Sequence, residues 1–198
     1  MRMTKAEFYS KIAEECILQL LGEYEKNPYN FFSESDVKCR LFTLLFQNKD
    51  MRAMSKTIDG KLTRPLHTEI AYFDDEGRLV FRVDLSAVDP AYTDVYGSLK
   101  HGRIRLAKGY RADVCYFAIE LKFNKRSKKE NMLRIWEEDM MKLVDIKTRN
   151  PYLTCFSVLL DKKNNAIDEK ELQDIKTKYP GIKIAYSNMN GQYYLGNF

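Results

Sequence analysis

The sequence predicts an α/β fold with a mixed central β-sheet flanked by helices. Two observations carry this prediction: the period of the apolar residues changes along the chain, and one strand–helix–strand step follows that change. Segments with helical spacing open the chain, and alternating segments follow from about residue 66. Strands joined by a tight turn pair antiparallel, whereas strands joined by a helix run parallel, so both pairings are expected in one sheet.

Two helices are expected at the start of the chain. The first spans residues 4–26, because Thr4 and Glu7 form a capping box and the apolar residues behind them recur at helical spacing. It should end before Asn27-Pro28. The second begins near Ser33 and ends before Asn48, and the polar stretch after it, residues 49–64, is expected to form a loop.

Three strands follow these helices. Residues 66–73 and 79–88 alternate between apolar and polar, and the turn signal Asp74-Asp75-Glu76-Gly77 joins them as a hairpin. Strict alternation in the second strand places Val83 and Leu85 on one face. Residues 114–123 have one wholly apolar face, so the three strands are expected to form an antiparallel meander.

The second half of the chain continues the alternation of helices and strands. A long helix is expected over residues 127–148, followed by a parallel crossover to an apolar strand at 152–160. An amphipathic helix over 168–179 and a hairpin of two short strands, 182–186 and 192–195, complete the chain. The whole chain, residues 1–198, is expected to form one domain.

Composition excludes several classes of protein. Hydrophobic residues make up 44% of the chain and charged residues 31%, which is typical of a folded protein, and the net charge of +5 permits a polyanionic partner. No uncharged apolar run approaches the ~18 residues of a membrane helix, so no membrane partner is expected. The four cysteines lie far apart, which favours small buried hydrophobes in a reducing cytoplasm, and no glycine-rich phosphate-binding loop is present.

A charged pair inside the strand at 114–123 is the most informative local pattern. Glu120 and Lys122 are two residues apart and share one face of that strand, and Asp84 lies in the strand before it. Two carboxylates close together repel each other unless a cation lies between them, and Mg²⁺ is the usual cation at such a site. A neighbouring lysine can orient water or stabilise charge on a phosphoryl group. Seven acid-x-lysine triplets occur in the chain, but only the one at Glu120 combines an apolar strand, a preceding Asp-bearing strand and a following long helix.

These residues resemble the motif of the PD-(D/E)XK, or restriction-endonuclease-like, nuclease superfamily. The resemblance rests on Arg82-Val83-Asp84-Leu85, on Ile119-Glu120-Leu121-Lys122 and on the long helix that contains Glu138-Asp139-Met140-Met141-Lys142-Leu143. It covers about residues 33–160 and implies an αβββαβ core, with the helix at 4–26 before it and an αββ extension at 161–198 after it. Val83 stands where the motif has proline, and the segment between Asp84 and Glu120 is long for this core.

The resemblance implies a nuclease that depends on Mg²⁺, with Mn²⁺ as an alternative, and that cleaves nucleic acid, most often DNA. Asp84 and Glu120 match the metal-binding acids, and Lys122 matches the catalytic lysine. Family members often add a glutamate from the helix before the first strand. Glu34 fits that position, and Glu69 on the first strand is a rival for the same role, also as a metal ligand.

Two basic segments flank the Glu-x-Lys strand. The stretch from Tyr96 to Ala112 contains no acidic residue, and a second basic cluster follows Phe123. Such cations can neutralise phosphates without reading bases, although a solvated loop explains them equally well. The nucleic-acid-binding candidates are Lys100, Arg103, Arg105, Lys108, Arg111, Lys125 and Arg126.

Two other functions fit the same sequence. The chain can be a nucleic-acid-binding or assembly module that has the fold but does not cleave, or an unrelated α/β protein in which Glu120 and Lys122 are surface residues. A homodimer stays open by analogy with double-strand cutters of the superfamily, although no segment indicates a dimer interface.

Overall fold

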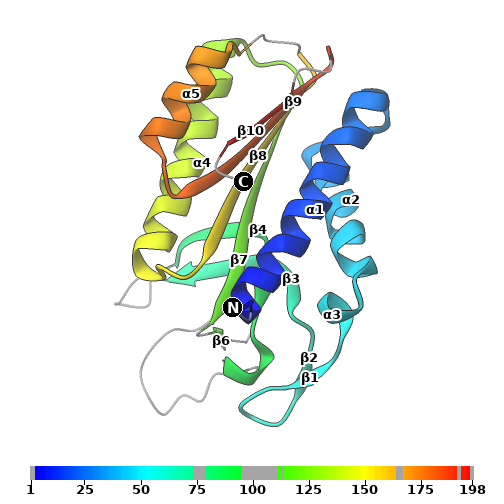
Figure 1. Ribbon diagram of the computed structural model, residues 1–198, viewed down its shortest axis with the longest axis vertical. Helices are drawn as coiled ribbons and strands as arrows, with labels where there is room; N and C mark the ends of the chain where they lie inside the picture. Colours follow the sequence, from blue (N-terminus) through cyan, green and yellow to red (C-terminus); the bar gives the residue numbers. More distant parts are fainter. Residues whose placement is uncertain are drawn as a thin grey trace.

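The computed structural model of the chain describes residues 3–73, 79–94, 111–112, 114–163, 167–190 and 193–196. A six-stranded mixed sheet with the strand order β10-β9-β8-β7-β4-β3 lies between two layers of helices (Figure 1). The predicted α/β class with a mixed sheet flanked by helices is confirmed.

The first helical layer consists of α1 and α2. Helix α1 (Lys5–Lys26) begins at the capping box of Thr4 and Glu7, and α2 (Glu34–Gln47) begins at Ser33, whose hydroxyl accepts a hydrogen bond from the Asp36 N–H. A short 3₁₀ turn, η1 (Pro28–Asn30), joins them. Both predicted helices are confirmed. Within the described residues, no helix has the length and apolar character that crossing a membrane requires.

The predicted meander is confirmed as the strands β3 (Leu66–Phe73), β4 (Leu79–Val88) and β7 (Cys115–Asn124). They pair antiparallel in that order, and the turn at 74–78 lies outside the described residues. Helix α4 (Lys129–Arg149) then leads to β8 (Thr154–Asp161), which runs parallel to β7 as predicted. The sheet continues through α5 (Glu169–Lys178) to β9 (Ile182–Asn188), parallel to β8, and to β10 (Tyr193–Gly196), antiparallel to β9.

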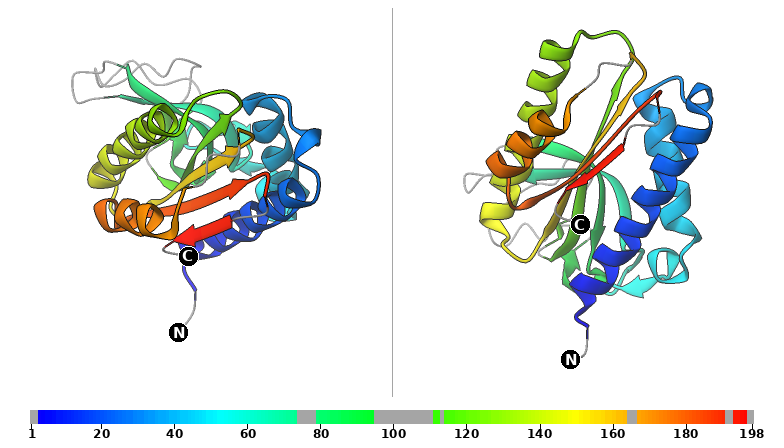
Figure 2. Two further views of the ribbon diagram at one scale, coloured as in Figure 1. Left: turned by 90° about the horizontal axis from the view of Figure 1, so that it is seen from above. Right: turned by 45° about the horizontal axis from the view of Figure 1, so that its top comes forward.

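The two faces of the sheet bury separate apolar cores. On one face, α1 and α2 pack on Phe117, Ile119 and Leu121 of β7, all of which are buried. On the other face, α4 and α5 pack on β8 and β9, with the fully buried Trp136 donating a 2.8 Å hydrogen bond to Ser157. Figure 2 shows the two helical layers on opposite sides of the strands. Because both faces are covered, β7 and β8 carry near-continuous apolar sequences.

Residues 49–64 are not the plain loop that their polarity predicts. They form a single helical turn, α3 (Lys49–Arg52), and a small antiparallel pair, β1 (Ser55–Lys56) with β2 (Leu62–Thr63). Asn48 caps α3 by accepting from the Asp50 N–H, and Met51 is buried. The segment before β7 also contains regular structure, the turn η2 (Pro90–Tyr92) and the pair β5 (Thr93–Asp94) with β6 (Arg111–Ala112). The cysteine prediction is confirmed for Cys115 and Cys155, but Cys39 is exposed.

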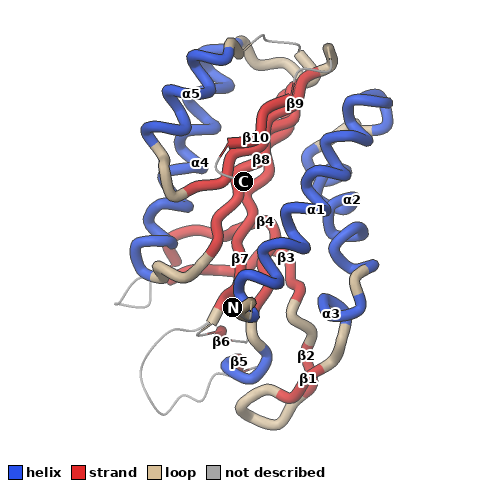
Figure 3. Tube along the Cα trace, viewed as in Figure 1, coloured by secondary structure: helices blue, strands red, loops and turns tan. Residues whose placement is uncertain are grey.

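The strict alternation predicted for the hairpin is wrong at its middle. Leu66 and Leu85 belong to the core under α1 and α2, whereas Ile70 and Val83 belong to the core under α4. Simple alternation would place Leu66 and Ile70 on one face of β3, and Val83 and Leu85 on one face of β4. Glu69, a non-glycine residue with a φ of +56°, lies between Leu66 and Ile70, where β3 changes from one core to the other. The part of β3 and β4 that is farther from β7 runs in a different direction from β7 (Figure 3).

Candidate functional site

Strands β4 and β7 separate at the two predicted acidic residues. The last backbone pair between β4 and β7, on the side of the β3–β4 turn, is Leu85 with Ile119. In the same register, Asp84 and Glu120 are the next residues, opposite each other. Where the backbone ladder stops, the Asp84 side chain replaces it: its Oδ2 accepts a hydrogen bond from the Leu121 N–H at 2.9 Å. The strand geometry therefore brings Asp84 to the strand that carries Glu120.

Glu69 lies across from Asp84 on the other side. Thr68 pairs with Leu85 and Ile70 with Val83, so Glu69 and Asp84 are the pair between them. Lys38 of α2 binds both carboxylates, donating to Glu69 and, at 3.1 Å, to Oδ1 of Asp84. Burial lowers the pKa of Lys38, but the hydrogen bonds and charges of the two acids outweigh it and raise that pKa above its ordinary value. Lys38 is therefore an ammonium that holds two carboxylates.

Glu120 is the most unusual ionisable group of the site. Its side chain is buried, with 7% of the residue exposed, and its Oε1 has no hydrogen-bond partner. Burial first, and then the charges of Asp84 and Asp139, raise the pKa of Glu120 to about 9 from an ordinary 4.5. The nearby Lys142 and Lys122 lower that pKa without cancelling the shift. At neutral pH the carboxyl keeps its proton unless another cation replaces it.

Lys122 is held between the two helical layers. Its Nζ lies 3.1 Å from Oδ2 of Asp139 on α4 and 3.5 Å from Oε2 of Glu34 at the start of α2. Burial lowers the pKa of Lys122, but the charges of Asp139 and Glu34 raise it to a net value above the ordinary one. Lys122 is therefore positively charged at neutral pH, and it can stabilise negative charge but cannot take up a proton.

Asp139 and Lys142 complete a cluster that we call the acid–lysine cluster. Asp139 is 4% exposed, and its Oδ1 accepts a 2.5 Å hydrogen bond from Lys142. With every group ionised, five carboxylates and three ammonium groups leave two net negative charges. The members are Glu34, Lys38, Glu69, Asp84, Glu120, Lys122, Asp139 and Lys142.

No protein-family model, curated protein or solved structure matches this chain.

All five predicted catalytic residues belong to the acid–lysine cluster, but they do not form one compact ligand set. Glu69 is linked to Asp84 through Lys38, whereas Glu34 contacts Lys122 and also accepts from the Phe123 N–H at 3.3 Å. Among the described residues, no three His, Cys, Asp or Glu side chains gather closely enough to hold a metal ion. Which of Glu34 and Glu69 completes a site at Asp84 and Glu120 stays a prediction.

Most of the predicted nucleic-acid-binding residues lie outside the described residues. These are Lys100, Arg103, Arg105 and Lys108, together with the side chain of Arg111, whose backbone belongs to β6. The two remaining candidates, Lys125 and Arg126, are exposed and directly follow β7. Their place puts two cations at the end of the strand that carries Glu120 and Lys122.

Sequence reasoning missed three members of the cluster. Lys38 belongs to a surface-like triplet, Asp36-Val37-Lys38, and nothing in its spacing relates it to Asp84. Asp139 did leave a signal: it stands three residues after Trp136, on the apolar stripe of α4, where an acid has to find a buried partner. Lys142 follows Asp139 by three residues and pairs with it within the helix.

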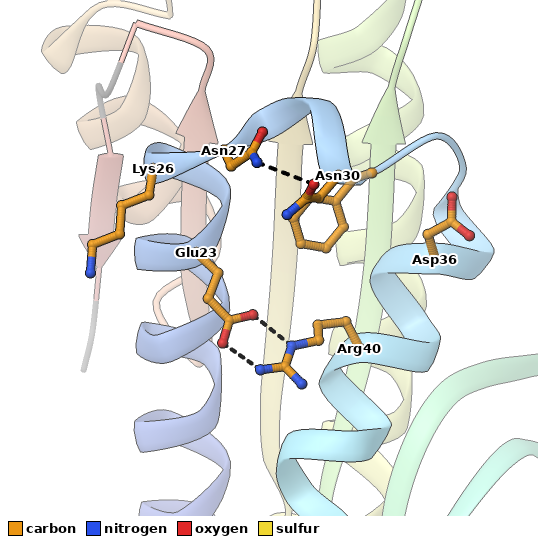
Figure 4. A pocket seen from close by; sticks show the side chains of 7 residues that line it. Glu23, Lys26, Asn27, Asn30, Asp36 and Arg40 are labelled. Atoms are coloured by element: carbon orange, nitrogen blue, oxygen red, sulfur yellow. Dashed lines mark hydrogen bonds and ion pairs between the residues drawn. The ribbon is translucent and has the colours of Figure 1, made fainter.

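A pocket of about 470 Å³ lies between α1 and α2, apart from the cluster (Figure 4). Arg40 donates from Nε and Nη2 to both carboxylate oxygens of Glu23, at 2.6 and 2.5 Å, and Asn27 donates to Asn30 at 3.2 Å. Glu23 and Arg40 in this pocket are therefore already paired with each other. No member of the acid–lysine cluster lines the pocket. We place the candidate site at the cluster.

Proposed function

We propose that the protein is a Mg²⁺-dependent nuclease that hydrolyses phosphodiester bonds, with Asp84, Glu120 and Lys122 at its active site. One observation carries the proposal: a buried carboxyl, with one oxygen unpartnered, stands next in register to a second carboxylate at the point where two strands separate. A lysine one pleat further along the same strand lies beside them.

The donor set fits a hard divalent cation. Glu120 offers an unpartnered Oε1, and Asp84 offers an oxygen that now accepts from Lys38. A divalent cation that displaces the proton of Glu120 would also neutralise the two net negative charges of the fully ionised acid–lysine cluster. Bound there, Mg²⁺ would supply a more acidic water and neutralise phosphate charge. Two carboxylates leave its other positions to water and phosphate oxygens, which is common for Mg²⁺.

Lys122 has the role of a fixed positive charge. Asp139 and Glu34 hold its Nζ from the two helical layers, and they keep it charged. A cation positioned before the reaction stabilises the charge that develops on the phosphoryl oxygens, without reorganisation at that moment. The order α2, β3, β4, β7, α4, β8 matches the αβββαβ core of the PD-(D/E)XK superfamily and supports the same proposal.

Cleavage assays with an Asp84→Asn variant test this function. The wild-type protein should cleave plasmid or oligonucleotide DNA with Mg²⁺ or Mn²⁺, and EDTA should stop the reaction. Asp84→Asn should lower the cleavage rate by about a hundredfold or more, since it removes one anionic metal ligand. Asp145→Asn is the control, because Asp145 pairs with Arg149 on the exposed side of α4. Cleavage that is equal in the Asp84 variant contradicts the proposal.

One observation favours a second function, nucleic-acid binding without cleavage. Lys38 already forms ion pairs with both Asp84 and Glu69, so each of these two acids has a cationic partner without a metal. This alternative predicts salt-dependent binding of DNA with no metal-dependent cleavage in the assay above.

Removing Lys38 should strengthen metal binding. Lys38→Met abolishes the ammonium that competes for Asp84, so the affinity for Mn²⁺ should rise by about tenfold. Mn²⁺ titration followed by electron paramagnetic resonance measures this without any cleavage. Arg40→Met is the matched control, because it removes a charge from the same helix that faces Glu23 instead. An unchanged or weaker affinity in Lys38→Met would show that Asp84 takes no part in metal binding.

A further inference from the structure

Two large aromatic side chains stand exposed in the loop that joins α1 to α2. Tyr29 is 65% exposed and Phe32 is 68% exposed. The ammonium of Lys162, just after β8, lies 5.4 Å from the centre of the Tyr29 ring and 5.3 Å from that of Phe32. It also donates a 3.0 Å hydrogen bond to the Phe31 carbonyl. One cation therefore fixes both rings while their surfaces face solvent.

The surroundings of these rings contain the acid Asp36 and a further cation, Lys125. Phe32 donates its N–H to Asp36 at 2.8 Å, and that bond, more than the charge of Lys125, lowers the pKa of Asp36. The contribution of Lys125 shows that it lies near the start of α2, and Arg126 follows it in the chain. Exposed rings and cations thus occur together at the ends of β7 and β8.

This surface adjoins the acid–lysine cluster. Phe32 stands two residues before Glu34, whose carboxylate lies 3.5 Å from Nζ of Lys122. The chain leaving β8 also stays close to the chain leaving β7, because the Lys162 N–H donates to the Asn124 carbonyl at 2.8 Å. The rings therefore directly precede the first turn of α2, whose Glu34 contacts the proposed catalytic lysine.

We propose that Tyr29, Phe32 and Lys162 form a platform on which unpaired nucleic-acid bases stack, next to the active site. The inference rests on the proposed function and names its substrate class: single strands, or single-stranded parts of a duplex. Aromatic rings bind bases of any sequence through their faces, and neighbouring cations bind the phosphates. Bases inside a duplex are already stacked on one another and do not offer these faces, so the platform selects unpaired strands.

Fluorescence anisotropy in EDTA, where metal-dependent cleavage is off, tests the platform. The probes are a fluorescein-labelled oligo-dT, an oligo-rU of equal length, and a DNA duplex of equal length. Tyr29→Ala and Phe32→Ala should each weaken single-strand binding by about tenfold and leave duplex binding within about twofold. Tyr152→Ala is the matched control, since this 87% exposed ring precedes β8 at the opposite end of that strand. All these rings are exposed, and circular dichroism checks that each variant is folded.

Each outcome decides the proposal. An equal loss of duplex and single-strand affinity, or no loss beyond that of Tyr152→Ala, overturns it. The oligo-dT and oligo-rU arms tell whether DNA or RNA supplies the bases. Because the assay measures binding alone, a protein that binds single strands through the platform but never cleaves would keep this inference and refute the nuclease proposal. If neither ring substitution changes cleavage or single-strand binding, the nuclease proposal stands and the platform inference is refuted.

Discussion

Lys122→Met is expected to lower metal-dependent cleavage by about a hundred- to a thousandfold, while the protein stays folded and binds metal. The substitution removes the ammonium at the site and keeps most of the side-chain volume. Asp139 still has Lys142 as a partner, so no acid of α4 becomes buried and unpaired. Single-turnover cleavage of a labelled oligonucleotide measures the rate, and Mn²⁺ titration of the same sample separates loss of chemistry from loss of metal.

Lys170→Met is the control for this experiment, because Lys170 is exposed on α5, a helix that contributes nothing to the acid–lysine cluster. It should cleave like the wild type. If Lys122→Met also cleaves like the wild type, either the activity comes from a contaminating nuclease or Lys122 has no part in the reaction.

Glu120→Gln is expected to make the protein more stable than the wild type as the pH rises. In the unfolded wild type Glu120 loses its proton above its ordinary pKa of 4.5, whereas in the folded protein it keeps the proton up to about 9. The folded state then binds more protons than the unfolded state, so the wild type loses stability as the pH rises through this range. Between pH 4.5 and 7 the loss is about 3 kcal/mol, and the glutamine variant escapes it.

Urea unfolding at several pH values measures the free energy of unfolding of both proteins. The difference between them should grow in favour of Glu120→Gln from about pH 5 upward, with a slope of about one proton. Glu25→Gln, an exposed acid on α1, should run parallel to the wild type. A difference that is constant with pH would mean that Glu120 ionises normally in the folded protein.

Local sequence signals predicted most of the architecture. Thr4, Ser33 and Asp168 each cap a helix where the sequence places it, and the parallel step from β7 to β8 follows from its connecting helix. These features depend on residues near one another in the chain. The short elements at 49–64 were missed, because one helical turn and two-residue strands leave no measurable period.

Within the candidate site, the residues on the strands were predicted from their pattern, and Glu34 on α2 was predicted from the family resemblance. The two-residue period of a strand relates Glu120 to Lys122, and Asp84 was found from its place in the preceding strand. Lys38 and Asp139 reach them from two different helices, and contacts between distant elements have no signature in one sequence. The left-handed backbone conformation of Glu69 could not be predicted from the sequence either, since glutamate rarely adopts it.

The change of face at Glu69 has a consequence for how mutations in the hairpin combine. Leu66 and Ile70 have the same parity, so simple alternation would assign them the same neighbours. A smaller side chain at Leu66 leaves space in the core that α1 and α2 cover, whereas one at Ile70 leaves space in the core that α4 covers. Substitutions in this strand should therefore couple energetically to one helical layer at Leu66 and to the other at Ile70.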